Sequence, residues 1–133
     1  MDVTKDNRLI WYRETTGAAL KHGEAAANGV TYYAEIPIGR ARNFSTTIVF
    51  DGTEIATYTI EGTDLQSGVD GLTCYAPAGT GWEPTTSLGS RAAASSASQV
   101  QFQVPAFEAR RARIKRVSGA AGVATPYFSA KGN

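Results

Sequence analysis

Clustered arginines are the residues with the plainest chemistry in this 133-residue chain. Five basic residues fall within seven successive positions: Arg110, Arg111, Arg113, Lys115 and Arg116. Guanidinium groups pair well with carboxylates and phosphates, so the cluster indicates either an anionic partner or pairing with the chain's own acids. Residues 43–90 hold six acids and no Lys or Arg, whereas residues 99–133 hold six basic residues and one acid. We therefore expect a polarised molecule, although the net charge is only +1.

A second group of candidate binding residues is apolar and lies near the N-terminus. Four apolar or aromatic residues stand together among charged neighbours: Leu9, Ile10, Trp11 and Tyr12. A further tryptophan, Trp82, stands in a Gly-Thr-Gly-Trp turn and is either a loop anchor at a surface or a core residue. Exposed aromatic rings can stack on sugars or anchor a protein interface, so these residues are candidates for either use.

Catalytic chemistry has little support in the sequence. The one histidine, His22, has no nucleophile motif around it, and the one cysteine, Cys74, stands in an apolar setting that is typical of a small buried residue. A single cysteine excludes an intramolecular disulfide and a multi-cysteine zinc site. An acidic loop at residues 64–70 is the best calcium candidate, but its spacing is not that of an EF-hand. We expect no enzyme, no cofactor and no metal.

The elements that must position these residues are β-strands, because apolar residues recur with period two from residue 30 onward. The clearest alternating segments are residues 31–38, 44–50, 55–60 and 99–104. The pair Asp51-Gly52 predicts a hairpin between the second and third of these segments. Residues 72–75 form a short candidate strand, and residues 87–98 are interpreted as a loop.

The arginine cluster lies in a segment that has two interpretations. Residues 107–117 alternate as a strand, with Ala112 and Ile114 on one side and Arg111 and Arg113 on the other. A helix after Pro105 is the alternative, because Ala, Arg, Lys and Glu form helices well. We favour the strand, since residues 118–122 are typical of a turn and residues 123–130 have β-type composition. That arrangement predicts a C-terminal hairpin.

Seven or eight short strands with turns between them predict an all-β fold, an antiparallel β-sandwich of jelly-roll type. The sandwich would span residues 30–133. Residues 1–29 are interpreted as an extended N-terminal arm that carries the apolar patch.

Two stretches of the chain resemble the capsid cement, or decoration, proteins of tailed bacteriophages, which are small jelly rolls. The first is the closing region, which contains Gln101-Phe102-Gln103-Val104-Pro105-Ala106-Phe107, Arg111-Ala112-Arg113-Ile114-Lys115 and Tyr127-Phe128-Ser129-Ala130. The second is the central Ala56-Thr57-Tyr58-Thr59-Ile60-Glu61-Gly62-Thr63-Asp64. About half of the chain takes part in the resemblance.

The resemblance implies a structural virion protein that binds the major capsid protein on the outer capsid surface and stabilises its lattice. It further implies a homotrimer that is made in the host cytoplasm. Under this hypothesis Leu9, Ile10, Trp11 and Tyr12 supply the arm contact, and Arg110, Arg111 and Arg113 supply the polar contact.

Two alternatives to the cement protein stay open. One is a carbohydrate-binding or host-adhesion module that uses Trp82 and loop tyrosines, and the other is a head-fibre or tail decoration protein. Nucleic acid is not the expected partner, because the near-neutral charge lacks the basic excess of such domains. No membrane association is expected either, because no run of 18 apolar residues and no basic, apolar leader is present.

Overall fold

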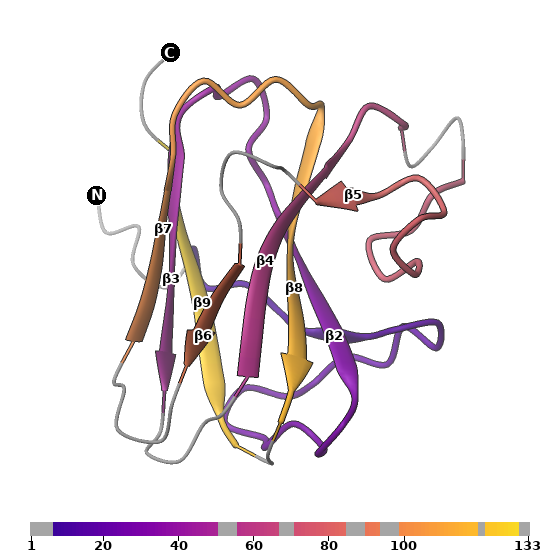
Figure 1. Ribbon diagram of the computed structural model, residues 1–133, viewed down its shortest axis with the longest axis vertical. Coiled ribbons are helices and arrows are strands. Elements are labelled where there is room, and N and C mark those ends of the chain that lie inside the picture. Colours follow the sequence, from indigo (N-terminus) through magenta and orange to yellow (C-terminus); the bar gives the residue numbers. More distant parts are fainter. Residues whose placement is uncertain are drawn as a thin grey trace.

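Two antiparallel β-sheets packed face to face form the molecule (Figure 1). The computed structural model describes residues 7–50, 56–66, 71–84, 90–93, 99–119 and 122–130. In this part of the chain the larger sheet has six strands: β1 (Tyr12–Arg13), β2 (Thr31–Ile36), β4 (Ala56–Thr63), β5 (Glu83–Pro84), β6 (Ser90–Ala93) and β8 (Arg111–Ser118). The smaller sheet has three: β3 (Phe44–Phe50), β7 (Gln99–Val104) and β9 (Ala124–Ala130).

The two sheets differ in how their strands are ordered. The larger sheet runs β1-β2-β8-β4, and both β5 and β6 then pair with β4, at different positions along its length. The smaller sheet runs β7-β3-β9. This arrangement confirms the prediction of an all-β sandwich.

Alternation of apolar residues, which is regular in β3 and β7, explains the core. Side chains of successive strand residues point to opposite faces, so each strand contributes every second residue to the interior. The central residues of that interior are Ala34, Ile36, Phe44, Ile48, Tyr58, Ile60, Phe102, Val104, Ala112 and Ile114. The predicted strands 44–50 and 99–104 coincide with β3 and β7. The arginine-rich segment is a strand, β8, which settles the choice between strand and helix.

Both predicted hairpins are wrong. β3 and β4 lie in different sheets, and so do β8 and β9. β3 and β9 belong to the smaller sheet, and β4 and β8 belong to the larger one. The pair Asp51-Gly52 itself lies outside the described residues. A turn-forming pair is a local signal, so it does not tell which sheet the next strand joins.

Two further predictions need correction. Residues 72–75 belong to a loop over residues 71–82 and form no strand. The predicted loop 87–98 contains β6, which pairs with β4. Small Ala and Ser side chains gave no alternating pattern there, because that pattern needs large apolar residues that alternate with polar ones.

No helix in the described residues has the length and apolar character needed to cross a membrane.

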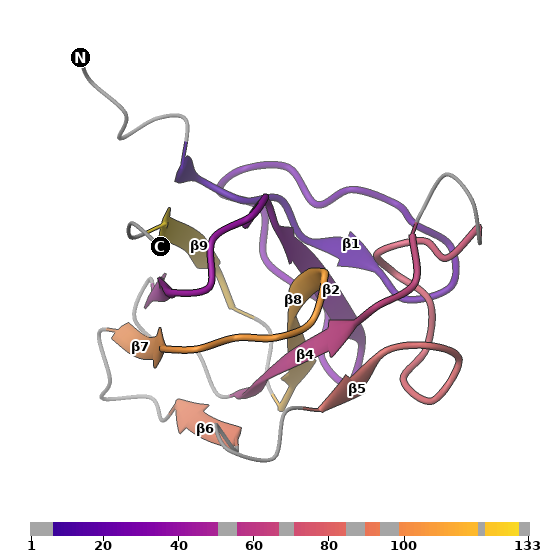
Figure 2. The same ribbon diagram turned by 90° about the horizontal axis from the view of Figure 1, so that it is seen from above.

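The segment predicted to be an arm lies against the sandwich in its described part, residues 7–29. Arg8 forms a bridge with Tyr127 of β9, and Tyr12 pairs with Tyr33 of β2. The segment therefore spans from the smaller sheet to the larger one along one side of the sandwich (Figure 2). The indole Nε1 of Trp11 donates a 2.8 Å hydrogen bond to the Ala124 carbonyl, which fixes this ring in the interior.

Candidate functional site: a groove supported by buried arginines

The outer face of the larger sheet carries the arginines of β8. Arg113 lies directly between Glu35 of β2 and Glu61 of β4 in the strand register. Ala112 and Ile114 point to the core, so Arg111 and Arg113 point outward. Arg116 points to the core instead and is fully buried. Its Cζ lies 5.8 Å from the centre of the Tyr32 ring. The four basic residues within β8 therefore divide between two faces, and Arg110 lies just before the strand.

Arg113 is a buried cation. Its exposure is 0%, and that of its partner Glu61 is 2%. The Nε of Arg113 donates a 2.8 Å hydrogen bond to Glu61 Oε1, and Nη2 lies 2.6 Å from the same oxygen. Its Cζ lies 3.6 Å from the Tyr33 ring centre and 4.5 Å from that of Trp82, so the guanidinium is held between two aromatic rings. Burial lowers the pKa of Arg113 and the hydrogen bond to Glu61 opposes this shift, so the group stays charged.

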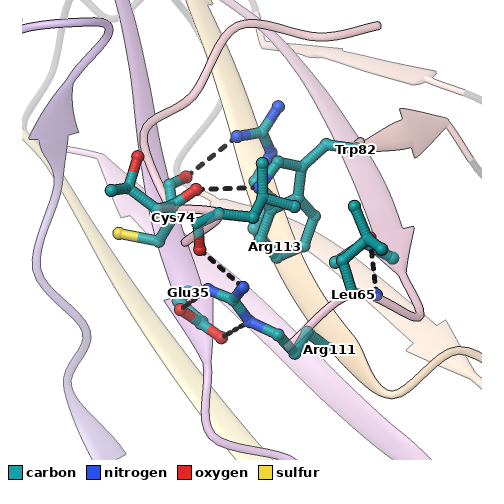
Figure 3. A network of polar contacts seen from close by, with 9 residues as sticks. Glu35, Leu65, Cys74, Trp82, Arg111 and Arg113 are labelled. Carbon is teal, nitrogen blue, oxygen red and sulfur yellow. Dashed lines mark hydrogen bonds and ion pairs between the residues drawn. The ribbon is translucent and has the colours of Figure 1, made fainter. Parts of the chain in front are cut away.

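The same arginine holds a loop over the sheet. Nη1 of Arg113 donates to the carbonyls of Cys74 and Ala76, at 2.9 and 2.6 Å. Trp82, the last residue of the loop, is fully buried and donates from Nε1 to the Thr73 carbonyl at 2.9 Å. Figure 3 shows these contacts from close by. The ring of Trp82 is therefore not free to stack on a sugar, and the adhesion hypothesis loses its main residue.

Arg111 makes a second set of contacts at the edge of the loop. Its Nε and Nη2 donate to the two carboxylate oxygens of Glu35, at 2.8 and 2.9 Å, and its Nη1 donates to the Leu72 carbonyl at 2.7 Å (Figure 3). This two-pronged geometry is the strong form of a carboxylate pair. The hydrogen bond to Glu35 raises the pKa of Arg111. The pair is partly exposed and so reaches the surface.

A groove of about 660 Å³ opens between the N-terminal segment and this loop. Its apolar lining includes Leu9, Ile10, Tyr12 and Tyr75, and the Arg111–Glu35 pair lines it as well. Cys74 also lines it, and burial raises the pKa of this thiol, which keeps it protonated at neutral pH.

The two walls of the groove are joined to each other. The Tyr12 and Tyr75 rings are tilted with their centres 6.3 Å apart, and the Thr15 amide donates to the Tyr75 carbonyl at 3.1 Å. Gly17, with φ of +70°, lies so close to Tyr75 that an added Cβ would stand 2.5 Å from the ring carbon Cζ. These contacts give the groove a fixed shape in the free chain.

The four residues of the N-terminal apolar patch fall into two groups, buried and groove-lining. Leu9 and Trp11 are buried in the core, so they are residues of the fold and not of an extended arm. Ile10 is 50% exposed and Tyr12 is half-buried, and both line the groove. The groove therefore brings part of the N-terminal apolar patch next to the arginine cluster.

The three predicted arginines have three different surroundings. Arg111 lines the groove, as described above. Arg110 is exposed and borders a neighbouring depression. Arg113 is covered by the loop and Trp82, so it cannot contact a partner and instead positions the groove wall.

Glu35 is a groove residue that sequence reasoning missed, because it belongs to no motif. Tyr75 is one of the tyrosines that the sequence offered as candidates for a binding platform, and it does line the groove. The glycines on either side of Thr80, with φ of +89° at Gly79 and +141° at Gly81, mark the tight turn that turns Trp82 inward.

The acidic loop that the sequence offers as a calcium site is described only in part. Asp64 accepts a 3.2 Å hydrogen bond from the Arg110 amide. Residues 67–70 of the candidate calcium loop lie outside the described residues. Among the residues that the structure describes, no group of three His, Cys, Asp or Glu side chains is placed to hold a metal.

The fold defines the class as a two-sheet antiparallel β-sandwich with a surface groove. No family model, curated protein or solved structure matches the chain.

Proposed function

We propose that this protein is a structural binding protein that docks on the outer surface of a phage capsid and stabilises the lattice of the major capsid protein. The observation that carries the proposal is the groove, where exposed Ile10 and the two tyrosines stand beside the Arg111–Glu35 pair. Protein interfaces favour aromatic and arginine anchors at their centres. The groove offers both on one surface.

Rigidity supports the same role. Binding costs less when the contact residues are already held in place, because less conformational freedom is then lost. Here the loop wall is held by four arginine-to-carbonyl and indole-to-carbonyl hydrogen bonds and by the buried Arg113–Glu61 pair. A decoration protein on a repeating lattice gains further from many simultaneous contacts.

We further propose that the sandwich is a jelly-roll variant. The order β2-β8-β4-β6 in one sheet and the pairing of β3 with β7 in the other support this, because the chain of a jelly roll passes repeatedly between its two sheets. Here it does so from β2 to β3 to β4 and again from β6 to β7 to β8. β9 would then be an added strand beside β3. The proposed assembly is a homotrimer, made in the host cytoplasm and carried on the virion.

Electron microscopy of phage particles from the source cells tests the proposal. Gold-labelled antibody to this chain is expected to mark the head shell, and particles that lack the chain are expected to lose their shells at a lower temperature. Label confined to the tail, or shells of equal heat stability without the chain, would overturn the capsid role.

A further inference from the structure

A second surface depression, of about 600 Å³, adjoins the groove at Arg111. Its lining is Gly39, Arg40, Arg42, Gln66, Arg110 and Arg111. Among the described residues that line it, four are arginines and none is acidic. The positive charge here is far denser than the net charge of +1 for the whole chain would give.

The fold brings the lining residues together from three distant segments, two of which supply the four arginines. Arg40 and Arg42 lie in the turn after β2, where the Ala41 amide donates to the Ile38 carbonyl at 2.8 Å. The Phe107 amide donates to the Arg42 carbonyl at 2.8 Å, which ties this turn to the segment before β8. The hydrogen bond from the Arg110 amide to the Asp64 carboxylate then ties that segment to the loop that carries Gln66. The convergence is thus part of the fold.

Charge in the depression is only partly balanced. Glu35 neutralises Arg111, and Asp64 stands nearby. Arg40 and Arg110 are exposed, and neither forms an ion pair with another residue in the described part of the chain. An anionic group placed here would meet guanidinium groups from several sides, which is the arrangement that binds carboxylates well.

We infer that this depression binds a carboxylate-rich segment of the partner protein whose apolar residues occupy the groove. The inference rests on the proposed docking function and deepens it. The shared residue Arg111 makes the apolar groove and the cationic depression one continuous surface, so a segment with apolar residues followed by Asp or Glu fits both. A nucleic acid fits less well, because it would need a longer basic stripe and has no use for the apolar groove.

The test uses hexaglutamate as the probe and the full chain as the protein, with amide chemical shifts as the readout. Shifts are expected at residues 39–42, 66 and 110–111 in low salt, and they should diminish as salt is added. The double variant Arg40→Gln/Arg110→Gln should weaken binding about tenfold, since two exposed charge contacts are lost. Arg13→Gln is the matched control, because Arg13 is exposed and lines neither hollow, and it should leave binding unchanged.

Several outcomes would overturn the inference. These are the absence of shifts at the named residues, an equal loss of binding in Arg13→Gln, and tighter binding of hexathymidylate than of hexaglutamate. If the Gln variant does not fold, Arg40→Lys/Arg110→Lys keeps the charge, loses the two-pronged geometry and should weaken binding by a smaller factor.

The experiment also separates this inference from the proposed function. If hexaglutamate binds as expected but the chain does not mark phage heads, the capsid role fails and the carboxylate site stands. If the chain marks heads and the double Gln variant marks them equally well, the carboxylate site fails and the capsid role stands.

Discussion

The guanidinium of Arg113 lies 4.5 Å from the centre of the Trp82 ring, and both side chains are wholly buried. The ring lies against the guanidinium of the Arg113–Glu61 ion pair, and both partners of this pair are buried. Because Arg113 also binds two carbonyls of the loop, the charge of one strand residue fixes the wall of the groove. Some arginines of the cluster thus stabilise the fold, and others are exposed at the surface.

Removing one partner of the buried pair should be costly. Glu61→Gln leaves Arg113 charged and poorly paired in an interior site, and we expect the free energy of unfolding to fall by about 3 kcal/mol. Urea denaturation measures this change. Glu83→Gln is the control, since Glu83 is an exposed acid in β5. A loss as small as that of the control would show that the pair contributes little.

Replacing both partners separates charge from loop anchoring. In Glu61→Leu/Arg113→Met no charge is left unpaired, so the double variant should be more stable than Arg113→Met alone. The Cys74 and Ala76 carbonyls still lose their donor, so amide hydrogen exchange in residues 71–82 should quicken. Unchanged exchange would contradict the anchoring role of Arg113.

Alkaline pH should weaken the fold through Tyr33. Burial raises the pKa of this phenol above its ordinary value of 10.0, and its hydrogen bond to Glu14 raises it further. The unfolded chain then loses the proton near pH 10 while the folded chain keeps it. The contribution of Tyr33 to stability is therefore constant below that pH and falls as pH rises above it.

The variant Tyr33→Phe tests this prediction. Cys74 adds a similar slope, because burial raises the pKa of its thiol from 9.0, so the comparison is made in a Cys74→Ser background. Tyr33→Phe should lose about 1 kcal/mol at neutral pH with the Glu14 hydrogen bond, and its stability should fall less steeply above pH 10. Parallel pH curves for the two proteins would disprove the assignment.

Gly17 should resist substitution for two separable reasons. Its positive φ disfavours any side chain, and a Cβ would overlap the Tyr75 ring. We expect Gly17→Ala to lower the free energy of unfolding by about 2 kcal/mol. Gly23→Ala is the matched control, since Gly23 has φ of +86° with nothing within 4 Å of the added Cβ, and should cost about 1 kcal/mol. Equal losses in a thermal melt would mean that Tyr75 simply moves aside.

The strands of this fold could be predicted because their burial alternates so regularly. Phe44, Thr46, Ile48 and Phe50 face one way along β3, and the same rule gave β7 and the outward position of Arg111 and Arg113. The pairing of the strands could not be predicted. Two-residue periodicity says which face of a strand is buried, but it carries no information about which sheet the strand joins.

The groove could not be predicted from the sequence, because the residues that line it are far apart along the chain. Ile10 and Arg111 were each singled out, but only the path of residues 7–13 across the side of the sandwich brings them to one hollow. Burial of an arginine was unexpected for the same reason. A charged residue is placed at the surface by default, and Arg113 departs from that default only because Glu61, Tyr33 and Trp82 surround it.

Substitutions of the adjacent residues Leu9 and Ile10 should distinguish an effect on stability from an effect on docking. Leu9 is 9% exposed and packs in the core, so Leu9→Ala should lower the free energy of unfolding by about 2 kcal/mol. Ile10 is half-exposed at the groove, so Ile10→Asp should change stability by less than about 0.5 kcal/mol and still abolish docking on the capsid. Val117→Asp is the control, since Val117 is 40% exposed and lines neither hollow.

Light scattering of these variants distinguishes two uses of the groove. The purified chain is expected to have three times the 14.1 kDa mass of one copy, and Ile10→Asp should leave that mass unchanged if the groove faces the capsid protein. If Ile10→Asp alone, and not Val117→Asp, reduces the mass to that of one copy, the groove is instead the interface between copies of this chain. A wild-type chain that stays monomeric at every concentration would contradict the trimer and leave single-copy docking as the form to test on capsids.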